Sequence, residues 1–163
     1  MVLRWSLWAH AVKAIAMTAE SPLWRTVRWR MTSAAATLQS MPDFIAMDVK
    51  TSIEKTNLLM PFCEDNFQIE KVQDSIKESI KILSKLPTEK REFRSVLVPP
   101  LMGKTEIEQI AQLLPKDASW QFAQFRNENC LDPEYNNISP YIEKEAIELV
   151  DFAKQFIKNA NLR

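Results

Sequence analysis

The sequence predicts an α/β fold with three parallel strands and flanking helices. Three short apolar segments, residues 43–49, 92–98 and 120–125, have the character of buried strands. They alternate with segments in which apolar residues recur every three or four positions, as on one face of a helix. Strands that alternate with helices pair in parallel through right-handed crossovers, so we expect one sheet covered by its own connecting helices.

The strand predictions depend on apolar runs that end in polar or turn residues. The first, DFIAMDV, has four consecutive apolar residues before Asp48, and a loop with a helical turn is expected over 51–67. The second, EFRSVLV, stops at Pro99-Pro100, because proline cannot continue a central ladder. The third, WQFAQF, leads into the turn-rich stretch 126–138.

The helix predictions depend on periodicity and on start and stop signals. Residues 69–86 have an apolar stripe and end at Pro87. Thr105 and Glu108 have the spacing of a capping box and open a helix that ends before Pro115. The sequence Ser139-Pro140 is typical of a helix start, and this last helix is expected to run to about Asn159.

Residues 1–40 differ from the rest of the chain, 41–163, so we expect two regions. The first 41 residues contain five Lys or Arg against one acid, whereas the remainder contains sixteen against twenty. Four of the five tryptophans also lie in this basic segment. Trp5, Trp8, Val12 and Ile15 have helical spacing, so the segment is expected to be helical or disordered.

Several origins fit this basic, Trp-rich segment. Its composition resembles an organellar presequence, whereas His10 and Lys13 interrupt the apolar core that a secretory signal requires. An interfacial membrane helix is a minority interpretation, and no run reaches the length of a membrane span. A third interpretation is a translated alternative frame, or a start codon upstream of a broken gene.

Composition excludes several classes of function. The chain has 21 basic and 21 acidic residues, so no net charge favours nucleic acid. The single glycine, Gly103, excludes glycine-rich phosphate-binding loops. Two distant cysteines, Cys63 and Cys130, suit a reducing compartment such as the cytoplasm and cannot form a metal site alone. Cys130 has no histidine in the ordered region to activate it as a nucleophile.

Candidate site residues lie where the predicted strands end. Ligands of parallel α/β sheets meet the carboxyl ends of the strands, where Asp48, Lys50, Gln124 and Arg126 are expected. Residues two apart on a strand point the same way, so Asp48 and Lys50 would lie side by side. They form either an ordinary ion pair or a site in which Lys50 meets a ligand carboxylate and Asp48 binds a cation or an ammonium.

Arg94 is a candidate of a different kind, because it lies early in its strand. It alternates with Val96 and Val98 and therefore shares their face. It either extends from a sheet edge towards water or lines the inside of a barrel and meets a carboxylate or a ribose.

Three motifs together resemble a known family. FIAMDVKTSIEK, EFRSVLVPPL and QFRNENCLDPEYNN, in this order and separated by amphipathic helices, are similar to the C-terminal part of anaerobic ribonucleoside-triphosphate reductase activating proteins. Those are radical S-adenosylmethionine enzymes of the glycyl-radical-enzyme activase group. The resemblance covers roughly residues 41–163. It implies the C-terminal half of a partial (β/α)6 barrel, with the fourth to sixth strands.

The resemblance also implies cofactors, a partner and residue roles. In the family, a 4Fe-4S cluster reduces S-adenosylmethionine to a radical that abstracts hydrogen from a glycine of the reductase. By resemblance, Lys50 meets the S-adenosylmethionine carboxylate, Asp48 lies near a monovalent cation, and Arg94 contacts the cofactor. Gln124 and Arg126 match a recurrent Gln-Phe-Arg of unassigned role.

The departures from the family shape the functional expectation. The CxxxCxxC triplet that holds the cluster is absent, as is the Gly-Gly-Glu stretch that meets the methionine amino group. We therefore expect a truncated activase with no catalytic residue, no metal ligand and no cluster, inactive alone as an oxidoreductase. Alternatives are a non-catalytic module that pairs with another half-barrel or the reductase, and a peripheral membrane protein acting through residues 1–40.

Overall fold

The computed structural model describes residues 3–5, 43–60, 66–128, 130 and 132–163, which form a five-stranded parallel sheet. The strands lie in chain order, β1-β2-β3-β4-β5. Their bounds are β1 Leu3–Trp5, β2 Ile45–Asp48, β3 Arg91–Leu97, β4 Trp120–Gln124 and β5 Ala160–Leu162. The helices are α3 Asn66–Leu83, α4 Lys104–Leu113 and α5 Glu143–Lys154. The predicted α/β class is confirmed.

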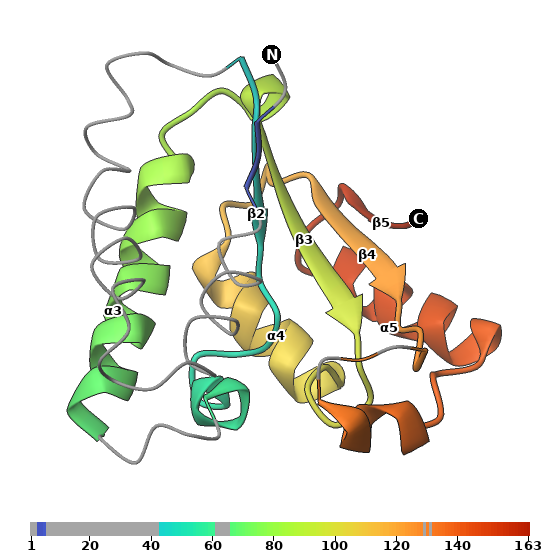
Figure 1. The fold of residues 1–163 in the computed structure, drawn as a ribbon. Helices are drawn as coiled ribbons and strands as arrows, with labels where there is room; N and C mark the ends of the chain where they lie inside the picture. The colour runs from blue at the N-terminus through green and yellow to red at the C-terminus, as the bar shows by residue number, and fades with distance from the viewer. Residues whose placement is uncertain (1–2, 6–42, 61–65, 129, 131) are drawn as a thin grey trace.

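The sequential strand order decides where the helices lie. When each crossover is right-handed and each new strand joins the same edge, every helix falls on one face of the sheet. Figure 1 shows α3 next to β2, α4 in the middle, and α5 beside β4 and β5. This winding is that of a barrel segment rather than of a doubly wound sheet, and none of the described helices lies on the second face of the sheet.

The core lies between the sheet and the three helices. Side chains along β3 alternate between buried and half-buried, with Phe93 and Leu97 fully buried. Phe93 pairs in register with Met47 on β2 and with Trp120 on β4. The helices contribute a matching apolar stripe, namely Ile76, Ile80, Ile107, Ile110, Ala146 and Val150.

A buried hydroxyl joins three strands within this core. Ser95 Oγ on β3 donates to the carbonyl oxygen of Val49 at 2.7 Å, and it accepts from Trp120 Nε1 at 3.0 Å. The indole N–H is thereby satisfied, as a buried tryptophan requires.

A buried arginine connects elements at the amino end of the sheet. Arg91, 2% exposed, donates from Nη1 to the carbonyl oxygens of Leu83 and Ser84 at the end of α3. Its Nη2 meets Asp117 Oδ1 at 2.6 Å, and Thr88 donates to Oδ2 of the same carboxylate. Arg91 thus satisfies carbonyls that have no partner within the helix.

The end of the last predicted helix, residues 155–159, is wrong. Helix α5 ends at Lys154, and β5 follows from Ala160 to Leu162. The backbone N–H of Trp120 donates to Asn159, so the chain adds a strand to the open edge of β4. Apolar residues in this stretch suit burial in either conformation, and the edge supplies the ladder hydrogen bonds that decide between them.

Other boundaries shift by a few residues. Helix α5 begins at Glu143 rather than at Ser139-Pro140, and α3 covers 66–83 rather than 69–86. The capping box at Thr105 and Glu108 is wrong, because Gly103 is the N-cap and Glu106 closes on its N–H. The expected helical turn after β2 is confirmed as Thr56–Leu59.

The amino-terminal segment contributes a strand. Leu3–Trp5 forms β1 and pairs in parallel with Ile45–Met47 of β2, whereas the sequence predicted helix or disorder. The remaining residues of this segment, 1–2 and 6–40, lie outside the described part of the chain. None of the helices that the structure describes has the length and apolar character needed to cross a membrane.

Candidate functional site

The face of the sheet opposite the helices carries a row of polar side chains. Parallel strands align residues directly in register, and the pairs Asp48–Arg94 and Arg94–Gln121 join β2, β3 and β4. Asn161 on β5 continues the row from Gln121. Paired residues on neighbouring strands project to the same side. In a barrel wound this way, that side is the interior.

Asp48 and Lys50 lie side by side, as their spacing predicted. Lys50 Nζ donates to Asp48 Oδ2 at 3.1 Å, and both side chains are partly buried, with 29% and 16% exposed. The N–H of Val49 donates to the Arg94 carbonyl, which fixes the backbone between them against β3. With the other described residues, Lys50 Nζ makes no further hydrogen bond or ion pair, so as far as they are concerned its ammonium keeps two donors for a ligand.

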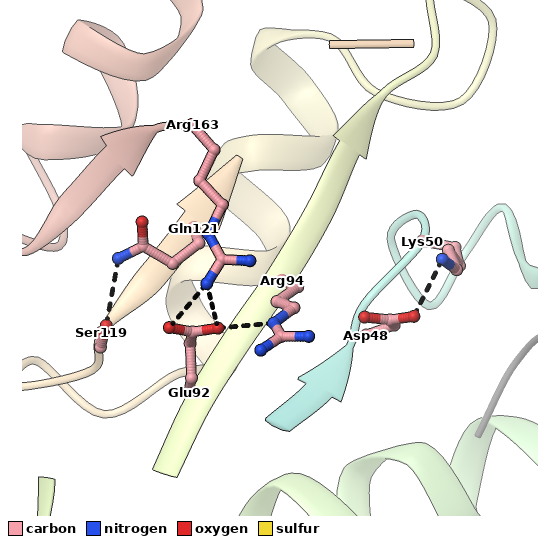
Figure 2. Close-up of polar contacts among 7 residues, drawn as sticks. All are labelled: Asp48, Lys50, Glu92, Arg94, Ser119, Gln121 and Arg163. Atoms are coloured by element: carbon pink, nitrogen blue, oxygen red, sulfur yellow. Dashed lines mark hydrogen bonds and ion pairs between the residues drawn. The ribbon is translucent and has the colours of Figure 1, made fainter. Parts of the chain in front are cut away.

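Arg94 lies on the face of the sheet opposite the helices, here called the open face, and it shares that face with Val96, as predicted, whereas Val98 lies beyond the end of β3. Its Nε donates to Glu92 Oε1 at 2.5 Å, and the Arg94 side chain is one quarter exposed. Figure 2 shows Arg94 between the Glu92 carboxylate and the Asp48–Lys50 pair. A ligand on this face would therefore meet cations from two adjacent strands.

Glu92 is held from a second direction by the last described residue, Arg163. The Arg163 guanidinium reaches across β4 and donates from Nη2 to both Glu92 oxygens, at 3.1 and 3.4 Å (Figure 2). Gln121 lies between them and bonds Ser119 Oγ at 3.2 Å. None of Glu92, Gln121 and Arg163 was singled out from the sequence. The alternation along the strand that placed Arg94 on one face also places Glu92, two residues earlier, on that face.

Gln124 and Arg126 do not join this row. Gln124 pairs in register with the buried Leu97 and follows the alternation of Trp120 and Phe122, which face the helices. Both residues are exposed; Gln124 is the last residue of β4, and Arg126 follows the strand. On β4, the residue beside Arg94 is Gln121, which the sequence did not single out.

The loop after β3 is anchored by a polar clamp. Lys55 Nζ meets Glu106 Oε1 at 2.9 Å and also donates to the Pro100 carbonyl. Glu106 Oε2 accepts from the Gly103 N–H at 2.8 Å. Burial raises the pKa of Glu106, but the hydrogen bonds from Lys55 and Gly103 outweigh burial and hold that pKa below its usual value.

Two further hydroxyls hold the same loop. Thr51 Oγ1 donates to the Leu101 carbonyl at 2.6 Å, and Tyr141 donates to the Met102 carbonyl at 3.2 Å. Burial raises the pKa of Tyr141, and the negative charge of Glu106 raises it further. The loops at the carboxyl ends of β2 and β3 thus form one hydrogen-bonded rim beside the polar row.

The residues present do not fit an iron–sulfur cluster. The whole sequence has two cysteines, whereas a cluster that keeps one open iron requires three at close spacing. Cys130 lies in a loop where its N–H donates to Asn136 Oδ1, and Cys63 lies outside the described residues. No group of three metal-ligating side chains gathers in the part that the structure describes.

This geometry defines the class of protein. The chain forms a parallel α/β sheet that winds like a barrel and has a polar open face, and this fold is compatible with part of a radical S-adenosylmethionine barrel. No family model and no solved structure matches the chain. The chain is 28% identical over 121 residues to a proposed glycyl-radical enzyme activating enzyme of Methanocaldococcus jannaschii. The match covers 74% of this chain and 49% of the relative, so the chain spans about half of that protein. The similarity supports a relationship with the radical S-adenosylmethionine activases.

Proposed function

We propose that this chain is the C-terminal half of a radical S-adenosylmethionine activase and that its open face forms one wall of a cofactor cleft. The observation that carries the proposal is the convergence of Asp48, Lys50 and Arg94 on the open side of a barrel-wound sheet. A wall of this composition suits a zwitterionic ligand, because it offers cations to a carboxylate and a carboxylate to a cation. The similarity to a glycyl-radical enzyme activating enzyme supports it.

Each residue has a role in binding. Lys50 takes the carboxylate of S-adenosylmethionine with the donors that Asp48 leaves free. Asp48 holds Lys50 in place and accepts a monovalent cation beside it. Arg94 offers the edge of its guanidinium, whose planar fork matches a carboxylate or a ribose. Gln124 and Arg126 stay predictions of lower rank, since they lie away from the row.

The chain is expected to bind the cofactor without performing radical chemistry. When bound to three cysteines, the cluster supplies the electron that cleaves S-adenosylmethionine, and this sequence has no CxxxCxxC. Reconstitution with iron and sulfide under anaerobic conditions, followed by visible absorption and analysis of 5′-deoxyadenosine, checks this expectation. Cluster-dependent cleavage by the chain alone would contradict it.

Binding is tested by equilibrium dialysis of S-adenosylmethionine against the full chain. Lys50→Met and Arg94→Met are expected to weaken binding at least about tenfold each, because each removes a charge-assisted hydrogen bond. Lys154→Met is the matched control: Lys154 pairs with Asp151 on α5, away from the open face, and its loss should leave affinity unchanged. Absence of binding by the unaltered chain would overturn the proposal.

The partner that we propose is the anaerobic ribonucleoside-triphosphate reductase, in the cytoplasm. The finer choice of this reductase depends on the resemblance of the three motifs described above, and the similar archaeal protein supports a glycyl-radical enzyme only in general. Anaerobic co-purification of the chain with this reductase, and separately with an unrelated glycyl-radical enzyme, shows whether the chain prefers the reductase. Equal recovery with both would remove the specific claim.

A second candidate is a non-catalytic module that pairs with a separate half-barrel. The observation that favours it is the open sheet, in which β1 and β5, among the strands that the structure describes, each pair on one side only. Unpaired strand edges accept another strand. Mixing the chain with the cluster-bearing half of an activase and measuring mass by light scattering tests this candidate; two separate species would exclude it.

A further inference from the structure

One carboxylate on the open face joins two arginines that are far apart in the sequence. Glu92 Oε1 accepts from Arg94 Nε at 2.5 Å and from Arg163 Nη2 at 3.1 Å. Its Oε2 is 3.4 Å from Arg163 Nη2. The Glu92 side chain is 12% exposed, so it is largely removed from water and takes its partners from these two guanidinium groups.

Glu92 binds Arg94 at Nε, the one guanidinium nitrogen that lies within the side chain. A guanidinium is a rigid plane with one Nε donor and four Nη donors. Because Glu92 takes Nε, it fixes the plane and leaves both Nη groups without a hydrogen-bond partner among the described residues. In Figure 2 one of these Nη groups points away from Glu92, towards the Asp48–Lys50 pair on the next strand.

The charge balance of the cluster favours an anion. Lys50, Arg94 and Arg163 provide three positive charges against the two of Asp48 and Glu92, which leaves one net positive charge. Without Arg163, two positive and two negative charges remain, so the cluster has no net positive charge and Glu92 is paired with Arg94 alone. An incoming carboxylate is then attracted less strongly, and the difference is larger where water is partly excluded.

We propose that Glu92 is the positioning residue of this site. It holds the Arg94 guanidinium so that the Nη edge faces the carboxylate-bearing part of the ligand, and Arg163 neutralises Glu92 while it does so. Glu92 and Arg163 act through Arg94 and do not touch the ligand. This inference rests on the function proposed above, because it assumes that the open face binds S-adenosylmethionine.

The first test uses the free protein and needs no ligand. Nitrogen-15 NMR of arginine side chains reports whether an Nε–H is held, and the Arg94 signal is assigned by its loss in Arg94→Lys. Glu92→Ala should remove the protected Arg94 signal, whereas Glu92→Gln should keep it, because the amide oxygen still accepts from Nε. Asp151→Ala, which breaks an exposed ion pair on α5, is the control and should change nothing. A protected Arg94 signal in Glu92→Ala would overturn the inference.

The second test measures S-adenosylmethionine binding by equilibrium dialysis with the same proteins. Glu92→Ala should weaken binding about tenfold, the effect of one charge-assisted hydrogen bond that is no longer pre-organised. Glu92→Gln should stay within about threefold of the unaltered chain. Arg163→Ala should weaken binding by removing the net positive charge of the cluster, while the Arg94 signal is kept.

The outcomes separate the two proposals. Equal affinities of the unaltered chain and Glu92→Ala would overturn the positioning role and leave the proposed function standing. No binding by any form would overturn the proposed function, and the NMR result would then decide alone whether Glu92 orients Arg94. Loss of both the signal and the affinity in Glu92→Ala, with rescue by Glu92→Gln, supports both.

Discussion

Replacing Arg91 at the amino end of the sheet should destabilise the protein mainly through the carbonyls at the end of α3. The Arg91 guanidinium is buried and bonds Leu83 O and Ser84 O, whereas its carboxylate partner Asp117 is 61% exposed. On removal of Arg91, Asp117 can return to water, but the Ser84 carbonyl loses the partner that it has among the described residues, and the Leu83 carbonyl keeps only the N–H of Leu86. The exposed ion pair should therefore matter less than the hydrogen bonds to the backbone.

The magnitude follows from three contributions. Each charge-assisted hydrogen bond contributes about 1.5–3 kcal/mol. Removing the buried guanidinium relieves a desolvation cost of several kcal/mol, which offsets much of that loss. The buried methylenes contribute about 0.8 kcal/mol each and are lost in Arg91→Ala but kept in Arg91→Met. We expect a loss of about 3–4 kcal/mol for Arg91→Ala, about 1–2 for Arg91→Met and at most about 1 for Asp117→Ala.

Urea unfolding followed by far-ultraviolet circular dichroism measures these differences, with equal slopes as the check that the comparison is valid. A loss in Asp117→Ala as large as in Arg91→Ala would refute the reasoning, because the ion pair would then dominate. Greater stability of Arg91→Met than of the unaltered chain would refute it too, since desolvation would outweigh the backbone bonds.

The pH dependence gives an independent check on Asp117. The hydrogen bond from Thr88 lowers the pKa of Asp117, with burial opposing and the charge of Arg91 adding to the decrease, from an ordinary value of 3.8. Because the folded pKa lies below the unfolded one, this stabilisation is complete above pH 3.8 and is lost as the pH falls through the folded pKa. The difference between the unaltered chain and Asp117→Ala should therefore disappear in acid.

Three further predictions concern the rim, the core and the sheet edge. Glu106→Gln should lower the free energy of unfolding by about 1–3 kcal/mol near neutral pH, because it weakens the bonds to Lys55 and Gly103. This loss should shrink as the pH falls from 4.5 through the lower pKa of the folded protein, where the carboxylate itself becomes protonated, and an unchanged loss in acid would contradict the reasoning. Ser95→Ala should cost about 1–3 kcal/mol in urea unfolding, since it leaves the Trp120 N–H without its partner, and a neutral effect would show that another acceptor replaces it. Removing residues 1–5 should expose the edge of β2 and increase concentration-dependent aggregation, measured by light scattering. A variant that keeps β1 intact is the control and should not show this increase.

The sequence alone predicted the elements whose signals are local. The strands at 43–49, 92–98 and 120–125 are confirmed because their apolar runs are bounded by turn residues or prolines. The contact between Asp48 and Lys50 is likewise confirmed, since residues two apart on an extended chain share a side whatever the rest of the fold does. Their role in binding a cofactor stays a prediction.

The elements that failed depended on partners distant in the sequence. The segment 160–162 is a strand because β4 has an open edge beside it, and no local signal distinguishes it from the end of a helix. Leu3–Trp5 joins β2 across about 40 intervening residues for the same reason. Strand propensity depends on which edge is available, so it is a property of the assembled sheet.

The sequence by itself determined the fold class, the face that Arg94 occupies and the absence of cluster ligands, because composition, alternation and residue identity are properties of the chain. Only the tertiary structure decided that Glu92 binds both Arg94 and Arg163, although Arg163 is 71 residues away in the sequence. It also decided that Gln121 rather than Gln124 joins the row of polar side chains. Register across parallel strands is set by how the helices pack each strand against the next. The partners of a charged side chain on the open face are therefore known only once the sheet is assembled.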